Sequence, residues 1–166
     1  RDPDELRVET PFERLTYDEA IEILQKEGHD ISWGDDFGAP HERALSEHVG
    51  DFVFVTHWPA KIKAFYMAAT DDGMYAKCGD LIAPEGYGEL IGGSERSTDL
   101  DLITKRLEAE GADVDEYGWY LDLRRYGSVP HSGFGLGMER FISYICKLDH
   151  VRDAVPFPRL PNRVRP

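Results

Sequence analysis

Apolar residues in the first fifty positions recur with the spacing of amphipathic helices. One such run ends at Gly28 and consists of Tyr17, Ala20, Ile21 and Leu24. Thr16 and Glu19 form a capping-box pattern at its start, because each can bond a free amide of the first turn. A second helix is predicted over residues 40–49, where Pro40 suits the first helical turn.

Strand-like runs follow, each rich in β-branched and aromatic residues. They cover residues 52–57, 63–69, 74–81 and 87–92. Asp71-Asp72-Gly73 lies between the second and third runs and predicts a hairpin turn.

Helical spacing returns after residue 97. Thr98 is predicted to cap a helix that ends at Gly111, and another helix is predicted to end at Gly127. Their apolar stripes are Leu100, Ile103 and Leu107, then Val114, Tyr117 and Leu121. Residues 132–137 predict a glycine-rich strand, a last helix follows from Met138, and the proline-rich tail predicts irregular structure. Because the strands cluster together, we expect an α+β fold with an antiparallel sheet flanked by helices.

The composition adds an unusual charge balance. Asp and Glu total 32 against 19 Lys and Arg, which gives a net charge of −13, and only 6 of the 19 cations are lysines. Such a surface does not favour nonspecific nucleic-acid binding. Abundant carboxylates with few lysines suit a halophilic protein, because high salt screens self-repulsion. An ordinary acidic protein is the alternative.

Two further features bear on the compartment. No apolar run is long enough to span a bilayer, so no membrane partner is expected. Cys78 and Cys146 are far apart and belong to no CxxC pattern, which indicates neither a disulfide framework nor a zinc site. We therefore expect a reduced, cytoplasmic setting.

The most informative stretch for chemistry is GSVPHSGFGLGMER at residues 127–140. Gly133, Gly135 and Gly137 leave one face of a strand without side chains, so a flat ring can lie on the backbone. Arg140 falls in the first turn of the next helix, where a guanidinium can stack on that ring and reach phosphate.

The string GFGLGMER resembles motif 3 of the class II aminoacyl-tRNA synthetases. YGELIGGSER, WYLDLRRYGSVPHSGFGLGMER and VPFPRLPNR resemble the asparaginyl branch of that family, and the resemblance extends over residues 11–166. It implies a class II antiparallel sheet flanked by helices. It also implies ATP-dependent activation of asparagine to the adenylate, followed by transfer to tRNA.

The resemblance implies a role for each matching position. Arg140 is expected to stack on adenine and contact the terminal phosphate, and Arg96 to hold the side chain of the amino acid. Glu89 is expected to bind Mg²⁺ between phosphates with Asp80 as its partner, although the segment between them carries a small insertion. The other expected contacts are Gly92 and Gly93 with the amino acid, and Gly133, Gly135, Gly137 and His131 with ATP.

The residues alone do not distinguish asparagine from aspartate as the substrate, because Arg96 donates equally well to a carbonyl or a carboxylate. The alternatives are an aspartyl-tRNA synthetase, a tRNA-independent asparagine synthetase of the same family, and a truncated noncatalytic paralogue that binds nucleotide. The chain shows no counterpart of motif 1, motif 2 or the anticodon-binding barrel. We therefore expect a linker at residues 1–10 and the carboxyl-terminal half of a catalytic domain at 11–166. This half alone is not expected to be competent, and the parent protein is expected to be a homodimer through motif 1.

Overall fold

The computed structural model describes residues 2, 5–6 and 9–165. The strands are β1 (Glu13–Thr16), β2 (Val53–Thr56), β3 (Cys78–Ala83), β4 (Gly88–Glu95) and β5 (Ser132–Leu136). The α-helices are α1 (Tyr17–Lys26), α2 (Ala39–Val49), α3 (Leu100–Ala109), α4 (Gly118–Arg125) and α5 (Met138–Cys146). Short 3₁₀ helices are η2 (Ala60–Ile62), η3 (Val114–Tyr117) and η4 (Val151–Ala154). Half of the predicted linker, residues 1, 3–4 and 7–8, lies outside the described residues.

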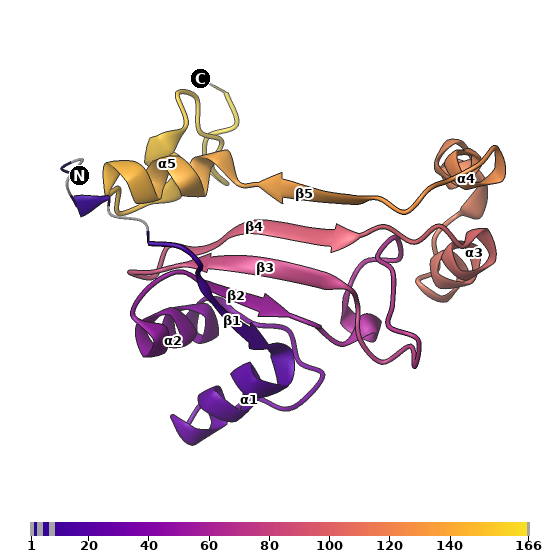
Figure 1. The fold of residues 1–166 in the computed structure, drawn as a ribbon. Coiled ribbons are helices and arrows are strands. Elements are labelled where there is room, and N and C mark those ends of the chain that lie inside the picture. Colours follow the sequence, from indigo (N-terminus) through magenta and orange to yellow (C-terminus); the bar gives the residue numbers. More distant parts are fainter. Residues whose placement is uncertain (1, 3–4, 7–8, 166) are drawn as a thin grey trace.

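The strands form one sheet in chain order, β1-β2-β3-β4-β5 (Figure 1). Strands β2 to β5 pair antiparallel, whereas β1 pairs parallel to β2. The α+β class is confirmed, and the sheet is mixed rather than wholly antiparallel. The parallel pair arises because α1 and α2 separate β1 from β2 and return the chain to its starting side.

Helices α1 and α2 pack on one face of the sheet through a buried cluster that includes Leu24, Leu45, Val53 and Val55. Helix α5 packs on the other face, where Tyr144 joins Phe52, Leu81 and Leu90. Helices α3 and α4 form a separate small cluster at the end of the sheet away from α5, where β4 ends and β5 begins (Figure 1). Residues of β3, β4 and β5 that belong to none of these clusters line a pocket.

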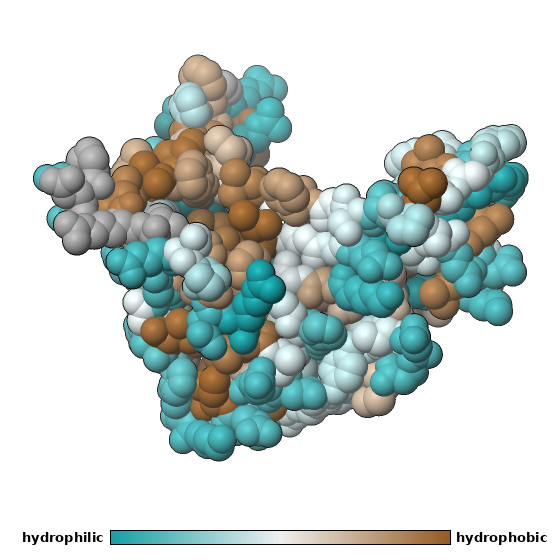
Figure 2. Space-filling model, viewed as in Figure 1, coloured by the Kyte–Doolittle hydropathy of each residue, from teal (hydrophilic) through white to brown (hydrophobic). Residues whose placement is uncertain are grey.

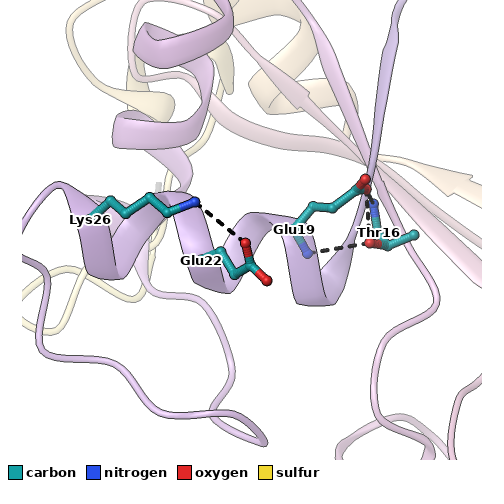
Figure 3. Close-up of polar contacts among 4 residues, drawn as sticks. All are labelled: Thr16, Glu19, Glu22 and Lys26. Atoms are coloured by element: carbon teal, nitrogen blue, oxygen red, sulfur yellow. Dashed lines mark hydrogen bonds and ion pairs between the residues drawn. The ribbon is translucent and has the colours of Figure 1, made fainter.

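The start of α1 forms as predicted. The Thr16 hydroxyl accepts from the Glu19 amide at 3.3 Å, and the Glu19 carboxylate accepts from the Thr16 amide at 2.7 Å (Figure 3). Glu22 and Lys26 add an exposed ion pair one turn apart at 3.4 Å. This short-range pattern was readable because capping boxes involve only neighbours in the chain.

Several predicted elements are wrong in detail. Residues 63–69 form no strand; they are a loop with isolated bridges at Met67 and Ala69. The third predicted strand starts at Cys78 instead of residue 74. Asp99, not Thr98, caps α3, and the helix predicted from Val114 begins as η3. No helix in the described part of the chain is long and apolar enough to cross a membrane.

Candidate functional site

Glycines let charged side chains lie against the surface of β4 and β5. Gly92 pairs with Gly135 across the two strands, and Ser94 pairs with Gly133. A Cβ atom at position 92 would lie 2.8 Å from Oε1 of Glu89, and one at position 133 would lie 2.9 Å from Nη2 of Arg96. Any side chain at either position would displace a charged group of the site.

The other predicted glycines have different surroundings. Gly93 lies against Phe134, whose Cβ would be 3.1 Å from a Cβ at position 93. Gly135 faces open space, with no heavy atom within 4 Å of such a Cβ. Gly137 is the N-cap residue of α5. Gly135 therefore provides the bare backbone on which a flat ring could rest.

Two pockets meet on this surface, and both are lined by Glu89 and Gly135. The first, about 480 Å³, is also lined by Asp80, Arg96, Lys63, Tyr66, Met67, Gly92, Gly93, Ser94 and Phe134. The second, about 580 Å³, is also lined by Arg140, Leu90, Gly137 and Glu139, by His150, Val151, Arg152 and Val155 in and around η4, and by Pro158, Arg159 and Leu160 of the proline-rich tail. The two adjoining pockets form a cleft in which Arg96 lines the first part and Arg140, Arg152 and Arg159 line the second.

A register shift brings Asp80 and Glu89 together. Asp80 pairs with Gly92, Leu81 with Ile91, and Ile82 with Glu89, so the pairing shifts by one residue between Leu81 and Ile82. The irregularity returns Glu89 to the face of the sheet that carries Asp80. The point where a Gly92 Cβ would lie is 2.8 Å from Glu89 Oε1 and 3.3 Å from Asp80 Oδ1.

The two carboxylates have different surroundings. Asp80 is 4% exposed and forms an ion pair with Lys63, whose Nζ lies 2.7 Å from Oδ2. Burial raises the pKa of Asp80, and Lys63 opposes that change. Burial also raises the pKa of Glu89, and the neighbouring Asp80 raises it further. Such paired, partly desolvated carboxyl groups are typical of functional sites.

The carboxylates suit a cation that takes few protein ligands. The described residues contain no group of three or more His, Cys, Asp or Glu side chains placed to hold a metal ion. Oδ2 of Asp80 is engaged by Lys63, whereas the Glu89 carboxylate borders both pockets. Magnesium retains several waters and binds through one or two carboxylates plus phosphates, so this pair fits Mg²⁺ bound with a nucleotide.

Arg96 is held in one orientation at the first pocket. Its guanidinium lies 4.6 Å from the centroid of the Tyr66 ring, and Nη1 donates to Ser94 Oγ at 3.1 Å. The backbone amide of Arg96 donates to the carbonyl of His131 at 2.9 Å. The His131 side chain is exposed and lines neither pocket, so its expected contact with ATP stays a prediction.

Arg140 lies in the first turn of α5 and borders the second pocket. Its Nη1 donates to the backbone carbonyl of Glu89 at 2.9 Å. The motif 3 arginine and the predicted metal ligand are therefore directly connected.

Sequence reasoning missed Lys63, Tyr66 and the tail as parts of the site. Because the sequence predicts a strand at residues 63–69, Lys63 was not recognised as the partner of Asp80. Nζ of Lys63 also lies 3.8 Å from the centroid of a Trp58 ring. The proline-rich tail has no helix or strand over residues 156–165, as predicted, and its residues Pro158, Arg159 and Leu160 line the second pocket together with residues of η4.

A family model described as tRNA synthetases class II (D, K and N) matches residues 2–161. The chain belongs to this family. The class II synthetase predicted from motif 3 is thereby confirmed.

Curated and solved relatives agree with this assignment. An asparagine–tRNA ligase from Lactobacillus gasseri is 54% identical over the whole chain. The asparaginyl-tRNA synthetase of Pyrococcus horikoshii, solved in complex with asparaginyl-adenylate, superposes with a TM-score of 0.91 at 53% identity over 95% of this chain and 37% of that one. An aspartyl-tRNA synthetase from Entamoeba histolytica gives 0.85 at 35% identity, over 94% of this chain and 33% of that one. The chain spans about 39% of the length of the Lactobacillus relative.

Proposed function

We propose that the protein containing this chain is an asparagine–tRNA ligase, which activates asparagine with ATP and transfers it to tRNA. The observation that carries the proposal is the cleft in which Arg96 and Arg140 occupy adjoining pockets that share Glu89. Adenylation needs an amino acid and a nucleotide placed end to end, with their reacting groups between the two binding sites. A cleft with Glu89 at the junction meets that requirement.

In this proposal Arg96 holds the asparagine side chain. Its guanidinium is oriented by the Tyr66 ring and by Ser94, so its donors are in place before substrate binds. Gly92 and Gly93 line the same pocket and would contact the amino acid through their backbone.

The second pocket would take ATP. Arg140 and Gly135 offer a cation and a bare strand surface for adenine and phosphate. Mg²⁺ held by Glu89, with Asp80 behind it, would neutralise charge on the phosphates.

The reaction proceeds by in-line displacement. A carboxylate oxygen of asparagine attacks the α-phosphorus, and the bond to the β-phosphate oxygen breaks to release pyrophosphate. A ribose hydroxyl of the terminal adenosine of tRNA then attacks the acyl carbon, loses its proton and displaces AMP. The chain's residues contribute by positioning the substrates and stabilising negative charge.

Identity favours asparagine over aspartate as the substrate. The asparagine–tRNA ligase of L. gasseri and the asparaginyl enzyme of P. horikoshii are 54% and 53% identical to the chain. The asparaginyl and aspartyl enzymes of E. histolytica, at 36% and 35% identity, do not discriminate between the two substrates. We also propose that the parent protein binds tRNA, forms a homodimer and works in the cytoplasm. Motifs 1 and 2, which would support dimerisation and tRNA contact, lie outside this chain by resemblance.

The test is ATP–pyrophosphate exchange with the full-length protein, using asparagine and aspartate separately, followed by tRNA charging. Asparagine-dependent exchange with tRNA charging is expected. Arg140→Ala should lower exchange about a hundredfold or more, because a preorganised cation facing phosphate is lost. Arg125→Ala is the matched control, since this exposed arginine lies in α4 away from both pockets.

Each contrary result has a distinct meaning. Exchange with aspartate alone would indicate an aspartyl enzyme, and ammonia-dependent conversion of aspartate to asparagine without tRNA would indicate the synthetase. Nucleotide binding without exchange would favour the noncatalytic paralogue. Near-normal exchange by Arg140→Ala would remove Arg140 from the site.

A further inference from the structure

Glu42 reaches the site from α2, although no sequence motif marks it. Its Oε2 accepts a hydrogen bond from the backbone amide of Glu89 at 3.2 Å. A Cβ atom at position 88 would lie 2.6 Å from the same oxygen. The carboxylate therefore lies directly against the backbone of β4, where Gly88 leaves it room.

The contact occurs where the strand pairing is irregular. The register between β3 and β4 shifts next to Ile82 and Glu89, and such shifts leave backbone groups that the neighbouring strand does not pair regularly. A backbone amide taken from water without an acceptor is unfavourable. Glu42 supplies that acceptor from the helix packed on this face of the sheet.

Arg140 of α5 also contacts this peptide segment, through the carbonyl of Glu89. The Glu89 amide donates to Glu42, and the Glu89 carbonyl accepts from Arg140 Nη1 at 2.9 Å. Glu42 Oε2 and Arg140 Nη1 lie 2.6 Å and 3.2 Å from the point where a Gly88 Cβ would be. Two helices thus hold the backbone of the residue whose carboxylate borders both pockets.

We propose that Glu42 is a positioning residue for adenylate formation. By accepting the Glu89 amide, it sets where the Glu89 carboxylate and the Arg140 guanidinium lie relative to each other and to the phosphates. It lines neither of the two pockets assigned to the substrates, and the contact through which it acts is the hydrogen bond that it accepts from the Glu89 amide. This proposal rests on the proposed function, because that function makes Glu89 and Arg140 the phosphate-binding pair.

A purely local role for Glu42 predicts different behaviour. Glu42 lies in the first turn of α2, where a carboxylate interacts favourably with the helix dipole and stabilises the helix. Losing that effect would lower the melting temperature without changing the kinetics of the folded protein. The kinetic parameters therefore separate the two roles.

The experiment compares Glu42→Met and Glu42→Gln in the full-length protein by ATP–pyrophosphate exchange. Both variants keep the length of the side chain, but only Gln keeps an oxygen acceptor. Met is expected to lower kcat about tenfold to a hundredfold and to raise the Mg²⁺ concentration at half-maximal rate, because small displacements of reacting groups are costly. The KM for asparagine should stay within about twofold. Gln should keep kcat within about threefold of the wild type.

Glu47→Gln is the matched control, an exposed acid on the same helix. Met with wild-type kcat, Met and Gln with equal losses, or losses that follow the fraction unfolded would each overturn the role of Glu42. Wild-type protein that exchanges with another amino acid would overturn the proposed substrate instead. The Glu42 comparison would then be run with that amino acid, so the two failures are distinguishable.

Discussion

Glu89 and Arg96 lie seven positions apart, yet they face different parts of the cleft. Glu89 borders both pockets beside Asp80, and Arg96 borders only the first, stacked on Tyr66. Two neighbouring strands make this possible, because Gly92 of β4 leaves room for the Glu89 carboxylate and Gly133 of β5 leaves room for the guanidinium of Arg96, which directly follows β4.

This division predicts opposite kinetic defects in two variants. Glu89→Gln should raise the Mg²⁺ requirement about tenfold or more with a smaller effect on asparagine, because a neutral amide is a poor ligand for Mg²⁺. Arg96→Ala should raise the KM for asparagine about tenfold or more and leave the Mg²⁺ requirement nearly unchanged. Separate titrations of Mg²⁺ and asparagine in the exchange assay test this. The same pattern in both variants would show that the two roles are not separable.

The limits of sequence reasoning are clearest at Asp80 and Lys63. Asp80 and Glu89 were paired by resemblance, but their spacing alone does not place them on one face of the sheet. The register shift between β3 and β4 does so, and it depends on pairing between strands. Lys63 was missed because its contact with Asp80 joins a loop to a strand 17 positions later in the chain.

Among the elements, those set by short-range signals were predicted best. The capping box of α1, the second helix, which covers Ala39–Val49 against the predicted 40–49, and the strand before α5 all form. Strand β1 was missed because its four residues have no alternating pattern and pair with β2 about forty positions later. The aromatic residues at 63–69 led to the wrong prediction of a strand, because Phe65 packs against Tyr117 and Tyr120 instead of entering the sheet.

The capping box of α1 predicts a measurable stability effect. Thr16→Ala should destabilise the full-length protein by about 1 kcal/mol, because the Glu19 amide loses its acceptor. Hydrogen bonds from the Thr16 backbone and hydroxyl lower the pKa of Glu19. A carboxyl group with a lowered pKa stabilises the fold above its unfolded-state pKa, and this effect is lost as the pH falls through the folded-state pKa.

Thermal unfolding at neutral and acidic pH tests this expectation. The difference between wild type and Thr16→Ala should shrink on acidification, because protonated Glu19 no longer favours the capped form. Lys26→Ala is the control, since its exposed pair with Glu22 should change stability by no more than about 0.5 kcal/mol. A difference that is constant with pH would show that the carboxylate of Glu19 takes no part.

Strand β5 leads to a prediction about the chain on its own. It pairs with β4 and is the last strand in the order of the sheet, and Phe134 is 73% exposed. Figure 2 shows hydrophobic residues gathered around α5 and the neighbouring end of β5, where Leu136, Met138 and Phe141 are exposed. An exposed apolar strand edge favours association between copies of the chain over a monomer with an ordered site.

We therefore expect residues 1–166 alone to show no asparagine-dependent exchange and to associate in solution. Exchange assays and light scattering of the purified chain test this, with the full-length protein as the reference. A monomeric chain with substantial Mg²⁺-dependent exchange would contradict the prediction.

Over the whole molecule, the charge imbalance is larger at the surface than the composition suggests. Several of the 19 cations are engaged inside the structure. Arg106 donates to the carbonyls of Ala60, Lys63 and Met67, and Arg124 donates to Ser97 and is 8% exposed. The buried pair of Lys63 and Asp80 removes one charge of each sign and leaves the balance unchanged. Arg106 and Arg124 contribute little to balancing the exposed carboxylates, so self-repulsion should be strong at low ionic strength.

We expect the melting temperature of the full-length protein to rise from dilute buffer to molar potassium chloride. The gain should be steepest at the dilute end, where the Debye length falls from about 30 Å at 0.01 M to about 10 Å at 0.1 M. Calorimetry over a salt series measures the effect. Neutralising exposed acids, as in Glu47→Gln with Glu108→Gln, should raise the melting temperature in dilute buffer and reduce the gain from salt, because less repulsion is left to screen. A melting temperature that is flat or falls with potassium chloride would contradict salt adaptation. The acidic surface would then need another explanation, because screening by salt weakens the repulsion between exposed carboxylates.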